Sequence, residues 1–225
     1  MALVALDFKP VLEFLPNFGR GVLITLGFAL FTIVVGTILG FLLFLLRNSR
    51  SKVLSAVAKG YIALIRGTPL LIQLYLFAYG LPRLIPGLNL GIYTSGLLAL
   101  ALNSSAYVAE IIRSGVQAVD EGQFEASRAL GFSRSYTMWH IIFPQAIRNV
   151  IPSLGNEFVT IVKESSIVSI LGIYDITRVS DLVKASTLKV FEALVVAALL
   201  YFVITSTLTY LIHKLEGRLT TYAKR

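Results

Sequence analysis

The chain has 225 residues, of which 56% are hydrophobic and 14% are charged, with a mean hydropathy of +0.79. Soluble domains average about 45–50% apolar and about 25% charged residues, so this composition excludes a disordered chain and favours a protein buried in lipid. The absence of Cys excludes disulfides and thiolate metal sites, and only two His remain for a metal. In an apolar chain, a net charge of +8 indicates basic cytoplasmic loops rather than nucleic-acid binding. We therefore expect an integral membrane protein.

Five segments are long and apolar enough to span the membrane as helices. About 20 mainly apolar residues cross the hydrocarbon core, and such runs lie at about 21–46, 61–81, 92–112, 150–173 and 191–212. In the first run, Gly36 and Gly40 form a small-xxx-small pair, which brings helices close together but also arises by chance. In the second run, Pro69 would end or kink an ordinary helix. Residues 1–16 lack the basic start of a signal peptide, so we expect a short segment on the membrane surface.

Lys and Arg are distributed unequally between the two sets of connecting segments. Thirteen of the 20 lie within 47–66, 113–148 and the tail from residue 214, whereas six lie in the other segments and Lys163 lies within the fourth run. Because cytoplasmic loops carry the excess of Lys and Arg, we expect the N-terminus outside and the C-terminus in the cytoplasm. The prediction is an all-α membrane protein, a single transmembrane domain of five helices with a cytoplasmic loop at about 114–148.

This loop between the third and fourth runs is too polar to span the membrane and too long for a simple turn. Asp120 begins an acidic pair of the type that favours a helix N-terminus, and Gly131 suits the position just after a helix end. A second short helix is expected from Arg134 to Ile142, followed by Pro144. The two helices would either lie in the headgroup layer with their aromatic side chains or dock a soluble partner.

Several strings along the chain resemble the membrane subunits of bacterial ABC importers. Glu125, Ala126 and Ser127, followed by Gly131, are similar to the EAA-loop signature, although Ser127 stands where that signature has a second Ala. The further strings are Arg66-Gly67-Thr68-Pro69-Leu70-Leu71, Ser105-Ala106-Tyr107-Val108-Ala109-Glu110-Ile111-Ile112-Arg113, Gly122-Gln123-Phe124-Glu125-Ala126, Pro144-Gln145-Ala146 and Lys163-Glu164-Ser165-Ser166. As a set, extending over about 20–216, they resemble the polar amino-acid uptake subfamily of histidine/glutamine/arginine type.

The resemblance implies a type I ABC importer permease in the cell membrane that moves a polar amino acid into the cytoplasm by alternating access. It also implies a second permease chain, identical or a paralogue, two ATPase subunits and an extracellular solute-binding protein. ATP and Mg would bind to the ATPase subunits, so this chain would hold no cofactor and would not be an enzyme. In agreement, the sequence contains no G-x-x-x-x-G-K-[ST] string. The residues implied in coupling to the ATPase are Gln123, Phe124, Glu125, Ala126, Ser127, Arg128, Gly131 and Pro144.

Polar side chains within the predicted spans are the candidates for substrate binding, because an ionisable group there costs at least ~2.5–3.5 kcal/mol on insertion scales. They form helical stripes on the third and fourth spans. The candidates are Asn103, Tyr107, Glu110, Glu157, Thr160, Lys163 and Glu164. Some of these residues can also be interpreted as structural. Glu110 would pair with Arg113 or extend to the membrane–water interface, and Lys163 and Glu164 would form an ion pair within the helix bundle.

The charges in these stripes favour a cationic substrate. Three acids and one base leave a negative surplus, and an uncompensated carboxylate in a low dielectric takes up a proton or binds a cation. We therefore expect a basic amino acid. The alternative is a proton- or cation-coupled secondary transporter or channel, in which Glu157 and Glu164 relay protons or coordinate cations. An intramembrane enzyme is disfavoured by the lack of Cys and the scarcity of His.

Overall fold

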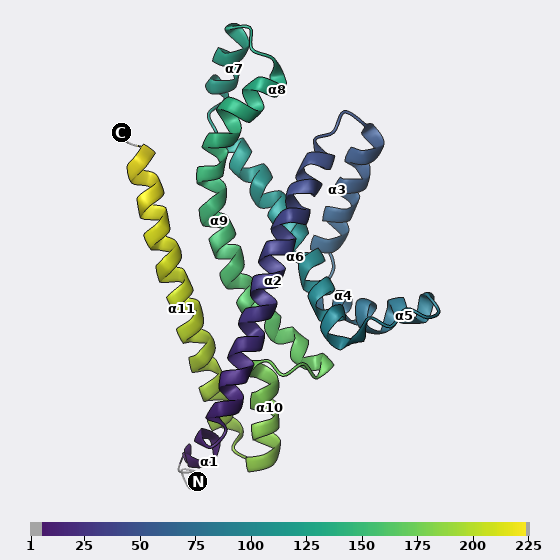
Figure 1. The fold of residues 1–225 in the computed structure, drawn as a ribbon, viewed down its shortest axis with the longest axis vertical. Coiled ribbons are helices and arrows are strands. Elements are labelled where there is room, and N and C mark those ends of the chain that lie inside the picture. The colour runs from purple at the N-terminus through teal and green to yellow at the C-terminus, as the bar shows by residue number, and fades with distance from the viewer. Residues whose placement is uncertain (1–5, 224–225) are drawn as a thin grey trace. The chain divides into compact units, whose positions relative to one another are not determined.

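The computed structural model describes residues 6–223, with side chains to Gly217, and every regular element within them is helical (Figure 1). The elements are α1 (Lys9–Leu12), α2 (Leu15–Arg47), α3 (Lys52–Arg66), α4 (Leu70–Tyr75), η1 (Leu76–Gly80), α5 (Leu81–Leu84), α6 (Gly91–Gln117), α7 (Glu121–Ala129), α8 (Arg134–Thr137), η2 (Met138–Ile142), α9 (Phe143–Glu164), η3 (Ser165–Leu171), α10 (Ile176–Thr187) and α11 (Val190–Ala223). The predicted all-α class is confirmed. Lys224 and Arg225, counted above as cytoplasmic charges, lie outside the described residues.

Three helices of the described chain are long and apolar enough to cross a membrane. They are α2, α6 and the part of α11 from Val190 to Gly217, with mean hydropathies of 2.7, 1.4 and 2.1. They contain the first, third and fifth predicted spans, although α2 begins earlier, at Leu15, and α6 continues to Gln117. Helical hydrogen bonding continues past the apolar run at both ends, because the flanking polar residues are compatible with a helix.

The second and fourth predicted spans are interrupted. Helix α3 ends at Arg66 and α4 begins after Pro69, so the predicted break is confirmed and the pair is bent there. If this bent pair counts as one span, four candidates result. The fourth run divides into α9, which carries the ionisable residues Arg148, Glu157, Lys163 and Glu164, and the 3₁₀ segment η3. The count of five spans and the orientation of the termini stay predictions.

The described chain divides into two compact units. The first comprises residues 6–32, 70–100 and 159–208, and the second comprises 33–69, 101–158 and 209–223. Helices α2, α6, α9 and α11 each contribute residues to both units. The division therefore leaves the prediction of a single transmembrane domain undecided.

In the first unit, α10 packs against residues of α1, α2 and α11 through apolar side chains. The buried cluster contains Val11, Phe18, Ile176, Val179, Val183, Ala193 and Ala197. Asp175 caps α10, is fully buried, and accepts a hydrogen bond from the backbone N–H of Arg178 at 2.9 Å. The Tyr201 hydroxyl donates to the same carboxylate at 3.1 Å. Burial raises the pKa of Asp175 above its ordinary value, although these hydrogen bonds oppose the shift.

In the second unit, glycines allow helix backbones to approach closely. A Cβ atom built on Gly40 of α2 would lie 2.7 Å from Val108 Cβ of α6, and one on Gly36 would lie 2.7 Å from Ser104 Oγ. The close approach expected from the small-xxx-small pair is therefore confirmed. A Cβ on Gly115 of α6 would overlap the Val150 side chain of α9. Helix α6 is thus held tightly between α2 and α9.

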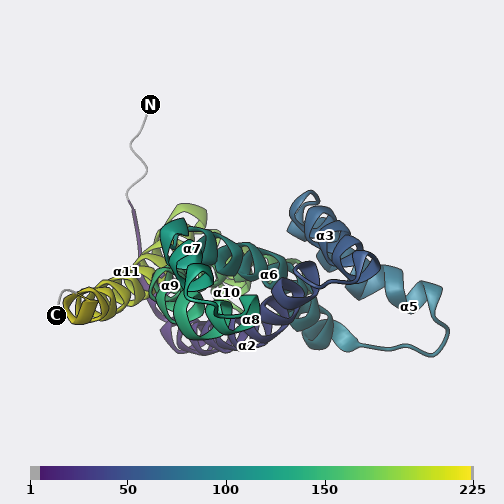
Figure 2. The ribbon, with the colours of Figure 1, turned by 90° about the horizontal axis from the view of Figure 1, so that it is seen from above.

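The polar loop folds into the two expected short helices, α7 and the α8–η2 segment, which pack against each other (Figures 1 and 2). Asp120 caps α7 by accepting from the Gly122 N–H at 2.8 Å, and Gly131 follows the helix with φ +86°, in the left-handed region that suits glycine. The Ser127 and Thr137 hydroxyls are hydrogen-bonded at 2.7 Å and buried between α7 and α8. Pro144 lies in the first turn of α9, where the helical path continues.

Candidate functional site

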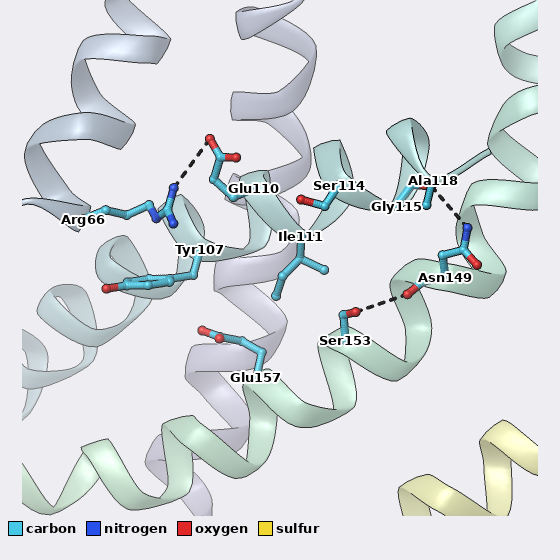
Figure 3. Close-up of a pocket in the computed structure, with 10 residues that line it drawn as sticks. All are labelled: Arg66, Tyr107, Glu110, Ile111, Ser114, Gly115, Ala118, Asn149, Ser153 and Glu157. Atoms are coloured by element: carbon cyan, nitrogen blue, oxygen red, sulfur yellow. Dashed lines mark hydrogen bonds and ion pairs between the residues drawn. The ribbon is translucent and has the colours of Figure 1, made fainter. Parts of the chain in front are cut away.

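A cavity of about 470 Å³ lies within the second unit, between the end of α3, α6 and α9 (Figure 3). Its volume falls within the range of about 300–1,000 Å³ found for small-molecule sites. The lining residues are Arg66, Tyr107, Glu110, Ile111, Ser114, Gly115, Ala118, Asn149, Ser153 and Glu157. The cavity therefore combines an apolar wall with a few hydroxyl, amide and charged groups, as a site for a small polar molecule requires.

Helical spacing explains how α9 presents its part of the lining. Asn149, Ser153 and Glu157 are four residues apart in succession, so they follow one face of the helix. The Ser153 hydroxyl donates to the Asn149 carbonyl at 3.2 Å, and the Asn149 amide donates to the Gly115 carbonyl of α6 at 3.4 Å. The Ser104 hydroxyl of α6 donates to Glu157 Oε1 at 3.4 Å. The two hydrogen bonds between the helices hold this face of α9 toward α6.

Glu110 binds three arginines from three helices. Arg113, one turn further along α6, donates from Nε to Glu110 Oε2 at 2.6 Å, and Arg47 at the end of α2 forms an ion pair with Glu110 Oε1. Arg66 at the end of α3 lies 3.7 Å from the same oxygen, as Figure 3 shows. The pairing with Arg113 that the sequence suggested is present, and two further arginines join it. One carboxylate among three guanidinium groups leaves this cluster positively charged, and Arg66 and Glu110 are its members in the cavity lining.

Arg66 is also placed by an aromatic ring. Its guanidinium carbon lies 5.5 Å from the centre of the Tyr107 ring, within the range of a cation–π contact. Glu110 and Tyr107 therefore fix the Arg66 guanidinium at the wall of the cavity from two directions. The side chain remains 44% exposed, so it is available to a ligand that enters the cavity.

The structure brings together some of the predicted substrate residues. Tyr107, Glu110 and Glu157 line this cavity. Asn103 is buried on α6 and lies outside the lining. The remaining candidates, Thr160, Lys163 and Glu164, belong to the first unit, and their role in substrate binding stays a prediction.

Among the polar lining residues, sequence reasoning missed Arg66, Ser114, Asn149 and Ser153. A signal for the last two was present, because the stripe through Glu157 continues at spacings of four toward the start of α9 as well as toward its end. No spacing within one helix connects Arg66 to this stripe. Its position depends on the break at Pro69 and on the packing of α3 against α6, in which Ile62 is buried with Ala106 and Ala109.

The residues implied in ATPase coupling lie largely at the surface of the second unit. Gln123, Glu125, Ala126 and Arg128 of α7 are exposed, and Phe124 is partly buried. Ser127 is the exception, because its hydroxyl is directed toward Thr137 rather than outward. A second Ala at this position would also be small enough to pack against α8. Whether these residues contact another subunit stays a prediction.

Comparison with known proteins identifies the class. Residues 32–220 match the family of binding-protein-dependent transport system inner membrane components. A putative glutamine transport system permease protein (GlnP) of Rickettsia bellii is 37% identical over 95% of this chain and 96% of its own length. The arginine transport system permease protein ArtQ of Bacillus subtilis is 37% identical over 95% of this chain and 97% of its own length. The crystal structure of an amino acid ABC transporter with histidines contains a chain that is 44% identical over 96% of this chain and all of its own, with a TM-score of 0.92.

The chain belongs to this family of inner membrane components of binding-protein-dependent transport systems. It is therefore a multi-pass permease of the inner membrane, and it works with ATPase subunits and a binding protein. The permease carries no ATPase site, because a separate subunit of such systems hydrolyses ATP. Family membership decides against the alternative of a secondary transporter or channel.

Proposed function

We propose that this permease moves basic amino acids into the cytoplasm and that its substrate site is the cavity between α3, α6 and α9. The observation that carries the proposal is that a carboxylate, Glu157, and a guanidinium, Arg66, line the same cavity (Figure 3). A basic amino acid carries a cationic side chain and an α-carboxylate, which such a pair complements. The names of the relatives, which refer to glutamine, arginine and histidines, support an amino acid as the substrate.

The distribution of charge in the cavity supports a preference for basic side chains. At one end, Arg66 and Glu110 line the cavity, and Arg47 and Arg113 pair with Glu110 from outside the lining, so Arg66 is left to attract the α-carboxylate of the substrate. At the other, Glu157 is the lining residue of α9 that carries a charge, and it attracts a cationic group. A substrate with a positive side chain therefore gains an attraction at Glu157 that a neutral side chain lacks.

The proposed membrane topology follows from the unequal distribution of Lys and Arg between the connecting segments. We place the N-terminus outside, five spans across the membrane and the C-terminus in the cytoplasm, because Lys and Arg concentrate on that side. A second copy of the chain or a related permease completes the pathway. The exposed surface of α7 contacts an ATPase subunit that binds ATP and Mg, and closure of two ATPase subunits drives alternating access of the cavity to the two sides.

Uptake by a Glu157→Gln variant tests the substrate site. In vesicles that contain the complete transporter and its binding protein, we expect kcat/KM for arginine to fall by about 10- to 100-fold, since a hydrogen bond to a charged group contributes about 1.5–3 kcal/mol. Uptake of glutamine is expected to fall less, because it has no cationic side chain. Glu13→Gln, an exposed glutamate of the first unit, is the matched control and should leave uptake unchanged. Unchanged arginine uptake by Glu157→Gln would refute the proposed site.

A further inference from the structure

A second and larger cavity, of about 820 Å³, lies in the same unit where α2 and α6 end. Its walls come from the end of α2 and the turn that follows, from α3, from the last turns of α6, and from the α8–η2 segment leading into α9. The cavity therefore connects the loop after the first span to the polar loop that contains α7 and α8. It shares no lining residue with the proposed substrate cavity.

The cavity is strongly basic. Arg47, Arg50, Lys59, Arg113 and Arg134 line it, and its described lining contains no Asp or Glu. Arg47 and Arg113 are neutralised in part by Glu110. Within residues 6–217, the other three bases form no ion pair, and all three side chains are exposed. Three bases from three different segments thus face one cavity without an anion to balance them.

Another part of the cavity lining is apolar and aromatic. Phe44, Met138, Trp139 and Phe143 contribute to the lining, and the Trp139 and Phe143 rings lie 5.1 Å apart between centres. Trp139 is the one Trp of the chain and is 45% exposed. Tryptophan at the end of an apolar span is typical of the membrane–water interface. Because α2 is apolar up to Arg47, a membrane that covers this apolar run would end near the cavity.

We propose that this cavity binds the phosphate of an anionic phospholipid. Arg50, Lys59 and Arg134 surround the headgroup phosphate. The part of an acyl chain nearest the headgroup lies along Phe44 and Trp139. Basic pockets between membrane helices bind anionic lipid headgroups by this combination of charge and apolar surface. A free phosphate ion would use the bases but leave the aromatic wall without a partner, so the lipid fits both halves. The inference goes beyond the proposed function and depends neither on the substrate nor on which terminus is outside.

A bound lipid of this type would join two loops that connect different spans. Arg50 and Lys59 belong to the loop after α2 and to α3, whereas Arg134 begins α8, which packs against α7. Without an anion, the mutual repulsion of these bases favours separation of the two loops. The anionic lipid therefore stabilises the position of α8 relative to the ends of α2 and α6.

Quenching of Trp139 fluorescence by brominated lipid tests the proposal directly, because the chain contains no other Trp. The full chain is reconstituted in vesicles of phosphatidylcholine with a fixed fraction of either brominated phosphatidylglycerol or brominated phosphatidylcholine. We expect stronger quenching by the anionic lipid, with at least about a fivefold local enrichment for each unpaired base. The preference should disappear in the variant Arg50→Gln/Lys59→Gln/Arg134→Gln. It should persist in Lys52→Gln/Arg148→Gln/Lys214→Gln, which removes the same charge from exposed bases outside the cavity.

Four outcomes would overturn the proposal. Equal quenching by the two brominated lipids, or a preference that survives the cavity variant, would show that no anionic lipid binds there. Loss of the preference in millimolar inorganic phosphate, but not in chloride of equal ionic strength, would assign the cavity to a free anion. The wild-type chain could also show no lipid preference while the cavity variant fails to co-purify with the ATPase subunit. This result would indicate that the bases bind the ATPase subunit instead of a lipid.

Discussion

Replacement of Gly40 by alanine is expected to destabilise the permease by forcing α2 away from α6. The added Cβ would lie 2.7 Å from both Val108 Cβ and Val108 Cγ1 and 2.8 Å from the Ser105 carbonyl oxygen. Real Cβ contacts are not this short, and one of the atoms belongs to the backbone, so rotation of the Val108 side chain cannot relieve the overlap. Inserting a methyl group into such a contact typically costs about 1–3 kcal/mol.

The matched control lies in the same helix. A Cβ on Gly27 would meet no atom within 4 Å, so Gly27→Ala removes only the backbone freedom of a mid-helix glycine and should stabilise by about 0.5–1 kcal/mol. Thermal unfolding of the two variants in one detergent measures the contrast. With about 2–4 °C per kcal/mol for a chain of this size, Gly40→Ala should lower the midpoint by about 2–12 °C and Gly27→Ala should raise it slightly. Equal midpoints for the two variants would refute the close helix contact.

Two further predictions concern the capped helices. Burial raises the pKa of Asp175 in the folded state, so its contribution to stability is complete below the ordinary carboxyl pKa and is lost as pH rises through the folded-state value. Asp175→Asn, which can still cap α10, should make the unfolding midpoint less dependent on pH above 4, and an identical pH profile would contradict this account. Gly131→Val places a β-branched residue at φ +86°, should cost about 1–3 kcal/mol, and should reduce co-purification of the ATPase, whereas Ser127→Ala should retain it.

The apolar helices and the local loop structure could be predicted from the sequence. Helices α2, α6 and α11 contain long, mainly apolar runs, so their composition alone identifies them. The end of α3 before Pro69 and the caps at Asp120 and Gly131 are set within a few residues of chain, and local chemistry is sufficient to predict them.

The charged cluster of the site could not be predicted in the same way. Within one helix, the spacing of Glu110 and Arg113 indicated an ion pair, but the approach of Arg47 and Arg66 depends on how α2 and α3 pack against α6. The boundaries of α9 were displaced for a related reason. Ionisable residues made the fourth run difficult to delimit, and α9 follows η2 directly at Phe143, so the helical path extends through Pro144.

Substrate protection of a single cysteine tests the central claim most directly. The chain has no Cys, so Ser153→Cys introduces a unique thiol in the lining of the proposed substrate cavity, and Ser186→Cys introduces an exposed one on α10 outside it. Both variants are labelled with a small thiol-specific reagent in the complete transporter. The proposed function predicts that arginine slows labelling of Ser153→Cys and leaves the labelling rate of Ser186→Cys unchanged. Identical labelling rates of Ser153→Cys with and without arginine, in a variant that still transports arginine, would contradict the assignment of this cavity as the substrate site.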